Sequence, residues 1–104
     1  MEVVLIVEVH RAVNSPAKTE FRIPKEKIVK YRREDPKNRT HWREYYLLSA
    51  PTIVEAVRVS NRGNITVRKI NVVANTYIDF MLNTREPTPE ELEAAKYMLG
   101  LNLE

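Results

Sequence analysis

The sequence predicts a single α+β domain, in which an antiparallel β-sheet or small barrel of four to six strands is followed by a C-terminal helix. The length of 104 residues suits one hydrophobic core. Short runs of β-branched and aromatic residues recur along most of the chain, as strands require. A helix start signal, Thr88-Pro89, precedes the final helical pattern.

The first third of the chain contains two predicted strands and one ambiguous segment. Residues 2–9 read EVVLIVEV and are largely apolar on both faces, as in a strand at the centre of a sheet. Residues 20–23 alternate as a second strand, which Pro24 ends because proline cannot donate to a strand ladder. Residues 25–34 suit a short helix, since proline favours a first helical turn, and suit a strand equally well. Both interpretations stay open.

The middle of the chain contains an aromatic strand. The composition of residues 35–40 predicts a turn or exposed loop. Residues 41–49 then form a predicted strand rich in aromatic residues. Alternation places Trp42, Tyr46 and Leu48 on one side of this strand.

The last third contains a hairpin and the helix. Residues 53–60 and 65–73 are the two predicted arms of the hairpin. Residues 75–83 fit either a short helix capped by Asn75 or an alternating strand. The helix is predicted over residues 89–99, because an N-cap, a proline and a glutamate three residues after the cap precede its apolar face.

The register of the hairpin can be derived from its sequence, because directly opposed residues of an antiparallel pair share a face. A three-residue loop that ends at Gly63 places Val59 opposite Ile65. It also places Val57 opposite Val67, so that one face is apolar and the other carries arginines. Three-residue loops commonly end in a left-handed residue, which glycine adopts without cost.

Several classes of chemistry are excluded by composition. The chain has no cysteine, which removes disulfides, thiolate nucleophiles and cysteine-based metal sites. Gly63 and Gly100 are the only glycines, too few for a phosphate-binding loop or dinucleotide fingerprint. The apolar run 3–7 is too short to span a bilayer and lacks signal-peptide flanks, so we expect an intracellular protein without a membrane partner. The only histidines, His10 and His41, show no catalytic or metal-binding spacing; we expect no enzyme, metal or cofactor.

The net charge is +3, and the charged residues are unevenly distributed. The chain has two basic segments and an acidic C-terminal region. Arginine and asparagine make bidentate contacts to guanine and adenine edges, and arginine and lysine bind phosphate. A two-stranded ribbon also fits the major groove of DNA. The predicted DNA-binding residues of the hairpin are Arg58, Asn61, Arg62, Asn64, Arg68 and Lys69. Those of the earlier basic segment are Lys25, Lys27, Arg32 and Arg33.

Residues 57–67, VRVSNRGNITV, resemble the strand, loop and strand of the AbrB/SpoVT-type swapped-hairpin family of transcriptional regulators. Residues 21–26, FRIPKE, resemble that family's second strand and helix start. The chain departs from the pattern, since the hairpin has Arg68 where proline is usual and residues 21–26 lack the loop glycine. The resemblance implies a DNA-binding dimer, or a pseudo-dimer of two copies in one chain. It also implies that Arg58, Arg62 and Arg68 lie on the side that contacts DNA.

Two functional hypotheses follow. The first is a small nucleic-acid-binding protein that acts as a dimeric, double-stranded DNA-binding transcriptional regulator through its basic hairpin. The alternative is a non-enzymatic protein-interaction module that uses a sheet edge, a groove or the C-terminal helix.

Residues 3–33 and 53–83 also align as a possible degenerate repeat. Trp42 and Tyr46 are interpreted as core residues rather than as a stacking platform for single strands.

Overall fold

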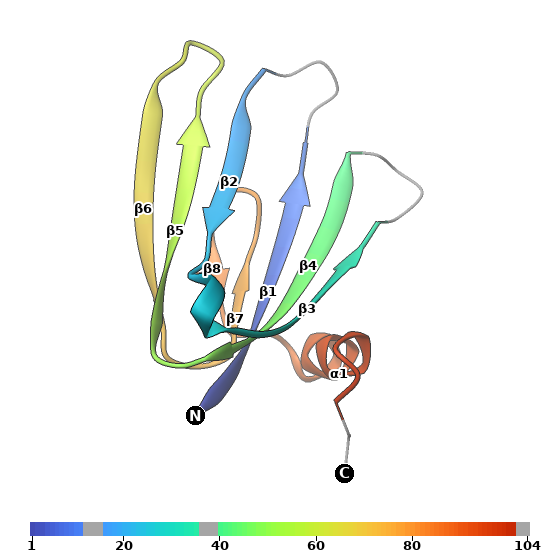
Figure 1. Ribbon diagram of the computed structural model, residues 1–104. Coiled ribbons are helices and arrows are strands. Elements are labelled where there is room, and N and C mark those ends of the chain that lie inside the picture. The colour runs from blue at the N-terminus through green and yellow to red at the C-terminus, as the bar shows by residue number, and fades with distance from the viewer. Residues whose placement is uncertain (12–15, 36–39, 102–104) are drawn as a thin grey trace.

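The computed structural model describes residues 1–11, 16–35 and 40–101 (Figure 1). Residues 36–39, part of the predicted loop, lie outside this range. The α+β class is confirmed, with strands through most of the chain and a helix near its end. The elements are β1 (Glu2–His10), β2 (Lys18–Arg22), the short 3₁₀ helix η1 (Lys25–Lys27), β3 (Ile28–Glu34), β4 (His41–Ser49), β5 (Thr52–Val59), β6 (Ile65–Val72), β7 (Thr76–Ile78), β8 (Thr84–Arg85) and α1 (Pro89–Met98).

The strands form two sheets. One has five strands in the order β3-β4-β1-β7-β8, and the other has three in the order β2-β5-β6. Neighbouring strands are antiparallel except for β1 and β7, which run parallel. The described residues form eight strands rather than four to six, because β3, β7 and β8 come from segments whose structure the sequence did not determine. Within the described residues no helix is long and apolar enough to cross a membrane.

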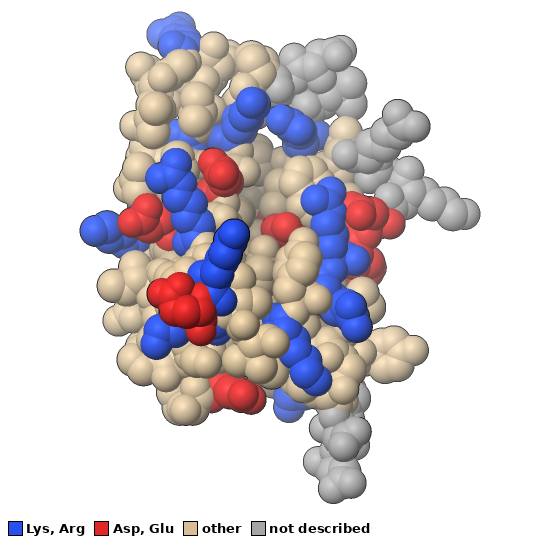
Figure 2. All heavy atoms as spheres, viewed as in Figure 1, with Lys and Arg blue, Asp and Glu red and all other residues tan. Residues whose placement is uncertain are grey.

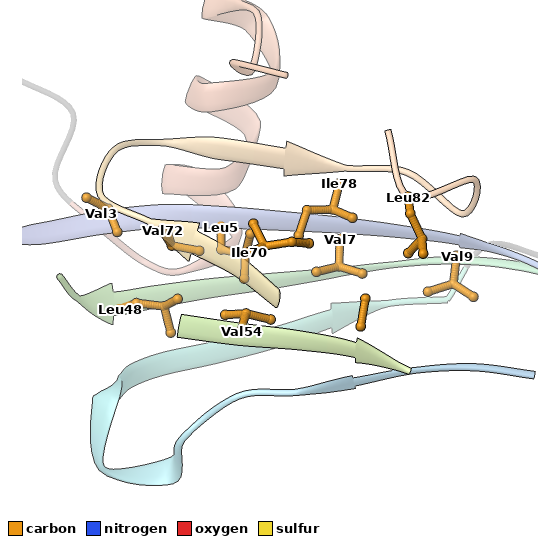
Figure 3. Close-up of a cluster of buried hydrophobic side chains, with 11 residues drawn as sticks. Val3, Leu5, Val7, Val9, Leu48, Val54, Ile70, Val72, Ile78 and Leu82 are labelled. Carbon is orange, nitrogen blue, oxygen red and sulfur yellow. The ribbon is translucent and has the colours of Figure 1, made fainter. Parts of the chain in front are cut away.

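The molecule has three layers, and β1 lies in the middle one. Its odd-numbered residues pack against the three-stranded sheet, and its even-numbered residues Val4 and Ile6 pack against α1. Both faces of β1 are therefore buried, which explains why its sequence is almost continuously apolar. The buried residues therefore form two cores. The first core lies between the two sheets, and the second lies between the five-stranded sheet and α1. Figure 3 shows the first core. Its buried members are Val3, Leu5, Val7, Val9, Leu48, Val54, Ala56, Ile70, Val72, Ile78 and Leu82.

The segment 25–34 combines both structures that the sequence allowed. Lys25–Lys27 form one 3₁₀ turn after Pro24, and residues 28–34 then form the edge strand β3. Pairing with β4 favours a strand over a helix here, because it brings Tyr31 next to Tyr46, with the two ring centres 4.8 Å apart. Cross-strand aromatic pairs of this kind stabilise a sheet beyond their intrinsic propensity.

The segment 75–83 is a short strand followed by a turn. Asn75 does not cap a helix, since its side-chain oxygen accepts a hydrogen bond of 3.0 Å from the Val4 amide. The carboxylate of Asp79 accepts hydrogen bonds from the Met81 and Asn83 amides and so closes the turn before β8. The short strand pairs with β1 instead of extending as a helix, because Ile78 is buried in the first core.

The C-terminal helix begins as predicted, with a complete capping box. Thr88 Oγ1 accepts a hydrogen bond of 3.2 Å from the Glu91 amide, and the Thr88 amide donates one of 2.9 Å to Glu91 Oε1. Arg85 donates two further hydrogen bonds, of 2.7 and 2.9 Å, to the same carboxylate. These bonds, the Arg85 guanidinium first, lower the pKa of Glu91 to about 2.

Candidate nucleic-acid interface

The β5–β6 hairpin has the predicted register. Val59 lies opposite Ile65, and Val57 lies opposite Val67. The Gly63 amide donates a hydrogen bond of 3.0 Å to the Ser60 carbonyl, which closes the three-residue loop. Gly63 has a φ of 83°, the left-handed conformation expected at the end of such a loop. The loop geometry predicted from the sequence is therefore confirmed.

The arginine face of this hairpin points toward the five-stranded sheet. Arg68 lies opposite Ala56, which is buried in the first core, so the arginines continue the core-facing side of the hairpin. Arg58 lies over the ring of Phe80, with its guanidinium carbon 6.0 Å from the ring centre. On the other face, Ile65 and Val67 are 68% and 51% exposed. The sequence separated the two faces correctly, and the structure shows that the outer part of the apolar face meets solvent.

The tip of the hairpin presents polar side chains to solvent. Ser60 Oγ accepts hydrogen bonds from the Arg62 and Asn64 amides, at 3.3 and 3.1 Å, and so fixes the loop backbone. Asn61, Arg62 and Asn64 are exposed. Within the part of the chain that the structure describes, their side chains have no hydrogen-bond or ion-pair partner. They are therefore available to a ligand.

A concave surface of about 360 Å³ lies beside the tip. Three predicted DNA-binding residues, Arg58, Asn61 and Asn64, line it together. Ala17, Ser60 and Thr66 complete its wall. We call this surface the tip hollow. It is the place where the structure brings predicted contact residues of the hairpin together.

A second concavity of about 350 Å³ opens at the same end of the molecule. Its walls include three apolar or aromatic residues, Val9, Trp42 and Phe80, and its lining also includes the basic residues Arg11 and Lys18. We call it the aromatic hollow. It adjoins the tip hollow, because Ala17 lines both. Figure 2 shows a recess in the upper part of the viewed face with Lys and Arg atoms around it.

Most of the earlier basic segment lies away from this surface. Lys25 and Lys27 lie in η1, toward the end of the molecule opposite the hairpin tip (Figure 1). Arg32 borders a hollow at the C-terminal end of α1, beside Leu99 and Gly100, where the helix dipole favours a cation. Arg33 forms an ion pair of 2.8 Å with Asp35.

The remaining predicted residues are separated by the alternation of the strands. Arg33 follows Arg32 directly, so their side chains point to opposite faces of β3. Arg33 also lies over the ring of Trp42, at 4.8 Å. Lys69 lies opposite Glu55, on the face of the hairpin away from Arg68. The ten predicted residues therefore do not form one continuous basic surface, and Figure 2 shows basic groups with acidic residues between them.

None of the described residues that line the aromatic hollow was predicted as a site residue, and three of them are important for its chemistry. Arg11 follows β1, Lys18 begins β2 and Phe80 lies in the turn after β7. The alternation of each strand can be read from the sequence, but it does not show that these three chain segments meet. The one available signal is that a basic residue stands at each end of the loop between β1 and β2.

The histidines and tyrosines have structural roles. His10 lies opposite His41, with ring centres 4.5 Å apart, and His10 Nε2 is 3.1 Å from Glu8 Oε1. In the described ranges no group of three or more His, Cys, Asp or Glu side chains could hold a metal. Trp42 and Tyr46 pack against the first core, as interpreted from the sequence, and Trp42 is only partly buried there, so that it also lines the aromatic hollow. Burial raises the pKa of the Tyr46 hydroxyl well above its usual value.

Comparison with protein families, with curated proteins and with solved structures found no match. The AbrB/SpoVT resemblance of residues 57–67 and 21–26 therefore stays a prediction. The same holds for the repeat of residues 3–33 and 53–83. The geometry of the chain itself is the basis on which a function can be assigned.

The end of the molecule that carries the two hollows combines complementary chemistry. The tip hollow offers guanidinium and amide donors from Arg58, Asn61 and Asn64. The aromatic hollow offers the rings of Trp42 and Phe80 beside cationic side chains. Donors that suit phosphates and base edges therefore lie next to apolar surface that suits a flat ring.

Proposed function

We propose that the protein binds nucleic acid, as a double-stranded DNA-binding regulator of transcription, through the tip of the β5–β6 hairpin. The observation that carries this proposal is the exposure of Asn61, Arg62 and Asn64 without partners in the described part of the chain. Their main chain is fixed by the Ser60 hydroxyl, so the side chains are held by an ordered loop. A loop whose backbone is already ordered loses less conformational entropy on binding than a flexible loop.

The chemistry of the tip suits both parts of a DNA duplex. An arginine such as Arg62 binds phosphate or the edge of guanine through two parallel hydrogen bonds. Asparagine binds the edge of adenine in the same bidentate way. Arg11 and Lys18, at the same end of the molecule, add cations for the phosphate backbone. We place the centre of the interface at the tip because the segment that contains Lys25 and Lys27 lies elsewhere.

Binding is tested with a labelled duplex of mixed sequence, using fluorescence anisotropy at several salt concentrations. We expect the affinity to fall steeply as salt increases, because bound cations release condensed counterions from DNA. Arg62→Ala should reduce the slope of log affinity against log salt by about one. Lys96→Ala, on α1, is the matched control and should leave the slope unchanged. Absence of binding at low salt overturns the proposal.

A second candidate function is supported by the outer edge of the small sheet. β6 is an edge strand, and its residues Ile65 and Val67 are 68% and 51% exposed. An exposed edge with apolar side chains can pair with a strand of another chain, including a second copy of this one. Sedimentation of the wild type and of Val67→Lys tests this candidate. Self-association that Val67→Lys removes would support it, and a monomer at all concentrations would count against self-pairing.

A further inference from the structure

The aromatic hollow lies next to the proposed DNA-binding tip and has a different chemistry. We infer that it receives one unstacked nucleobase, so that the preferred ligand is nucleic acid with at least one unpaired nucleotide. This inference rests on the proposed function and specifies which nucleic acid the same end of the molecule selects. The base enters between the ends of strands from both sheets, where Val9, Trp42 and Phe80 form apolar and aromatic walls.

The size and lining of the hollow suit a flat ring. Its volume of about 350 Å³ falls within the range of small-molecule sites, about 300–1,000 Å³. Bases that leave a stack are commonly held by aromatic side chains and by arginine planes. Trp42 and Phe80 supply the aromatic surface, and both are partly accessible to solvent rather than fully buried. An unstacked base therefore finds the contacts that it loses on leaving its neighbours.

The charges around the hollow suit the phosphates that flank such a base. Arg11 and Lys18 belong to its lining, and Glu20 is the one acidic residue among its described lining residues. Arg58 adds a third cation, because its guanidinium carbon is 6.0 Å from the ring centre of Phe80. Arg58 also lines the tip hollow. One arginine therefore stands between the site for the base and the site for the neighbouring nucleotide.

The tip hollow also favours a nucleotide over an apolar small molecule. A fatty acid or similar ligand would use the apolar walls and one cation, and it would leave the amides of Asn61 and Asn64 unused. When a nucleic-acid strand places one base against Phe80, its sugar-phosphate backbone continues past Arg58. The next nucleotide then reaches the amides of Asn61 and Asn64. The arrangement of the two hollows thus matches a linear polyanion with a flat ring at each repeat.

The experiment compares three labelled DNA ligands of the same sequence. They are a fully paired duplex, the duplex with one unpaired nucleotide, and the duplex with an abasic residue at that position. We expect the unpaired nucleotide to bind about fivefold or more tightly than the abasic residue, because only the base stacks on the aromatic walls. Trp42 is the only tryptophan of the chain, so its fluorescence reports the same event. We expect quenching with the unpaired nucleotide and none with the abasic duplex.

The outcomes separate the inference from the proposed function. Absence of binding to all three ligands overturns both. Equal affinity for the three, with unchanged Trp42 fluorescence, overturns the inference and leaves the proposed function standing. A free fatty acid that quenches Trp42 while the unpaired nucleotide does not would also overturn the inference, because it assigns the hollow to an apolar ligand.

Variants locate the effect. Phe80→Leu keeps the apolar volume and removes the aromatic face, so it should abolish the preference for the base over the abasic residue while duplex binding persists. Tyr97→Ala is the matched control, since Tyr97 is 77% exposed on α1. The preference should be unchanged in this variant. A preference that survives in Phe80→Leu overturns the assignment of the base to this hollow, and circular dichroism confirms that each variant is folded.

Discussion

The guanidinium of Arg68 donates a hydrogen bond of 3.0 Å to the main-chain carbonyl oxygen of Leu82. This bond joins the hairpin of the three-stranded sheet to the turn between β7 and β8 of the five-stranded sheet. Leu82 has a φ of 62°, a left-handed conformation that costs free energy in a residue with a side chain. Its side chain is buried in the first core. Arg68 therefore helps to hold a strained turn in place.

Arg68→Met is expected to lower the free energy of unfolding by about 1–2 kcal/mol, because the Leu82 carbonyl loses a charged donor. The change is measured by urea denaturation. Lys69→Met is the matched control, since Lys69 is the next residue on the strand and points to the opposite, exposed face. Its effect should stay within about 0.5 kcal/mol. Equal losses in the two variants would show that the bond to Leu82 contributes nothing specific.

The two faces of the hairpin differ in burial, and matched isoleucines on β6 test this. Ile70 is 9% exposed and belongs to the first core, whereas Ile65 is 68% exposed. Ile70→Ala should lower the free energy of unfolding by about 2–5 kcal/mol, since it leaves a cavity in a packed core. Ile65→Ala should lower it by less than about 1 kcal/mol. Denaturation curves of both variants give the comparison, and similar losses would contradict the orientation of the small sheet.

These residues also show what the sequence could predict. The hairpin register and the capping box depend on neighbours within a few positions, so the spacing of Val57, Val59 and Gly63 was sufficient to predict the loop. Which face of the hairpin would be buried was not predictable from β6 alone, because Ile65 and Ile70 have the same side chain and lie on opposite faces of the strand. Their difference in burial arises from which face of the small sheet packs against the five-stranded sheet, which is a tertiary property.

The same limit applies to the candidate site. Arg58, Asn61 and Asn64 were predicted because they lie close together along one hairpin. Phe80 was missed, since no local pattern shows that a turn after β7 meets strands from both sheets. The segment 25–34 was ambiguous for a related reason: its own propensities are balanced, and pairing with β4 decides between helix and strand.

The hairpin loop depends on the backbone conformation of Gly63. Its φ is 83°, and no atom lies within 4 Å of the place where a side-chain Cβ would be. Gly63→Ala should therefore cost about 1–2 kcal/mol through the left-handed backbone alone, without a steric clash. Gly63→Asn should cost less, because asparagine adopts this conformation more readily. Thermal unfolding of the two variants measures the difference, and the reverse order would show that contacts rather than backbone conformation determine the cost.

The ion pair between Arg85 and Glu91 predicts a specific dependence of stability on pH. The pKa of Glu91 is lowered from 4.5 to about 2 in the folded protein, first by the hydrogen bonds from Arg85. The folded state therefore keeps this carboxylate ionised at pH values where the unfolded chain protonates it. The resulting stabilisation is complete above about pH 5 and is lost as the pH falls toward 2.

Glu91→Gln should consequently be less stable than the wild type at pH 7, and the difference should shrink steadily between pH 5 and pH 2. Urea denaturation of both proteins at several pH values measures this difference in the free energy of unfolding. Because the difference is taken at each pH, the titration of the carboxylates that the two proteins share cancels. Glu93→Gln is the matched control, because Glu93 is exposed on the same helix and, in the described residues, forms no ion pair. A glutamine at this position can still accept a hydrogen bond from the Thr88 amide, so the substitution removes the charge and keeps the cap. A difference for Glu91→Gln that stays constant over this range would therefore show that the charge of Glu91 does not cause the loss, and would contradict the prediction.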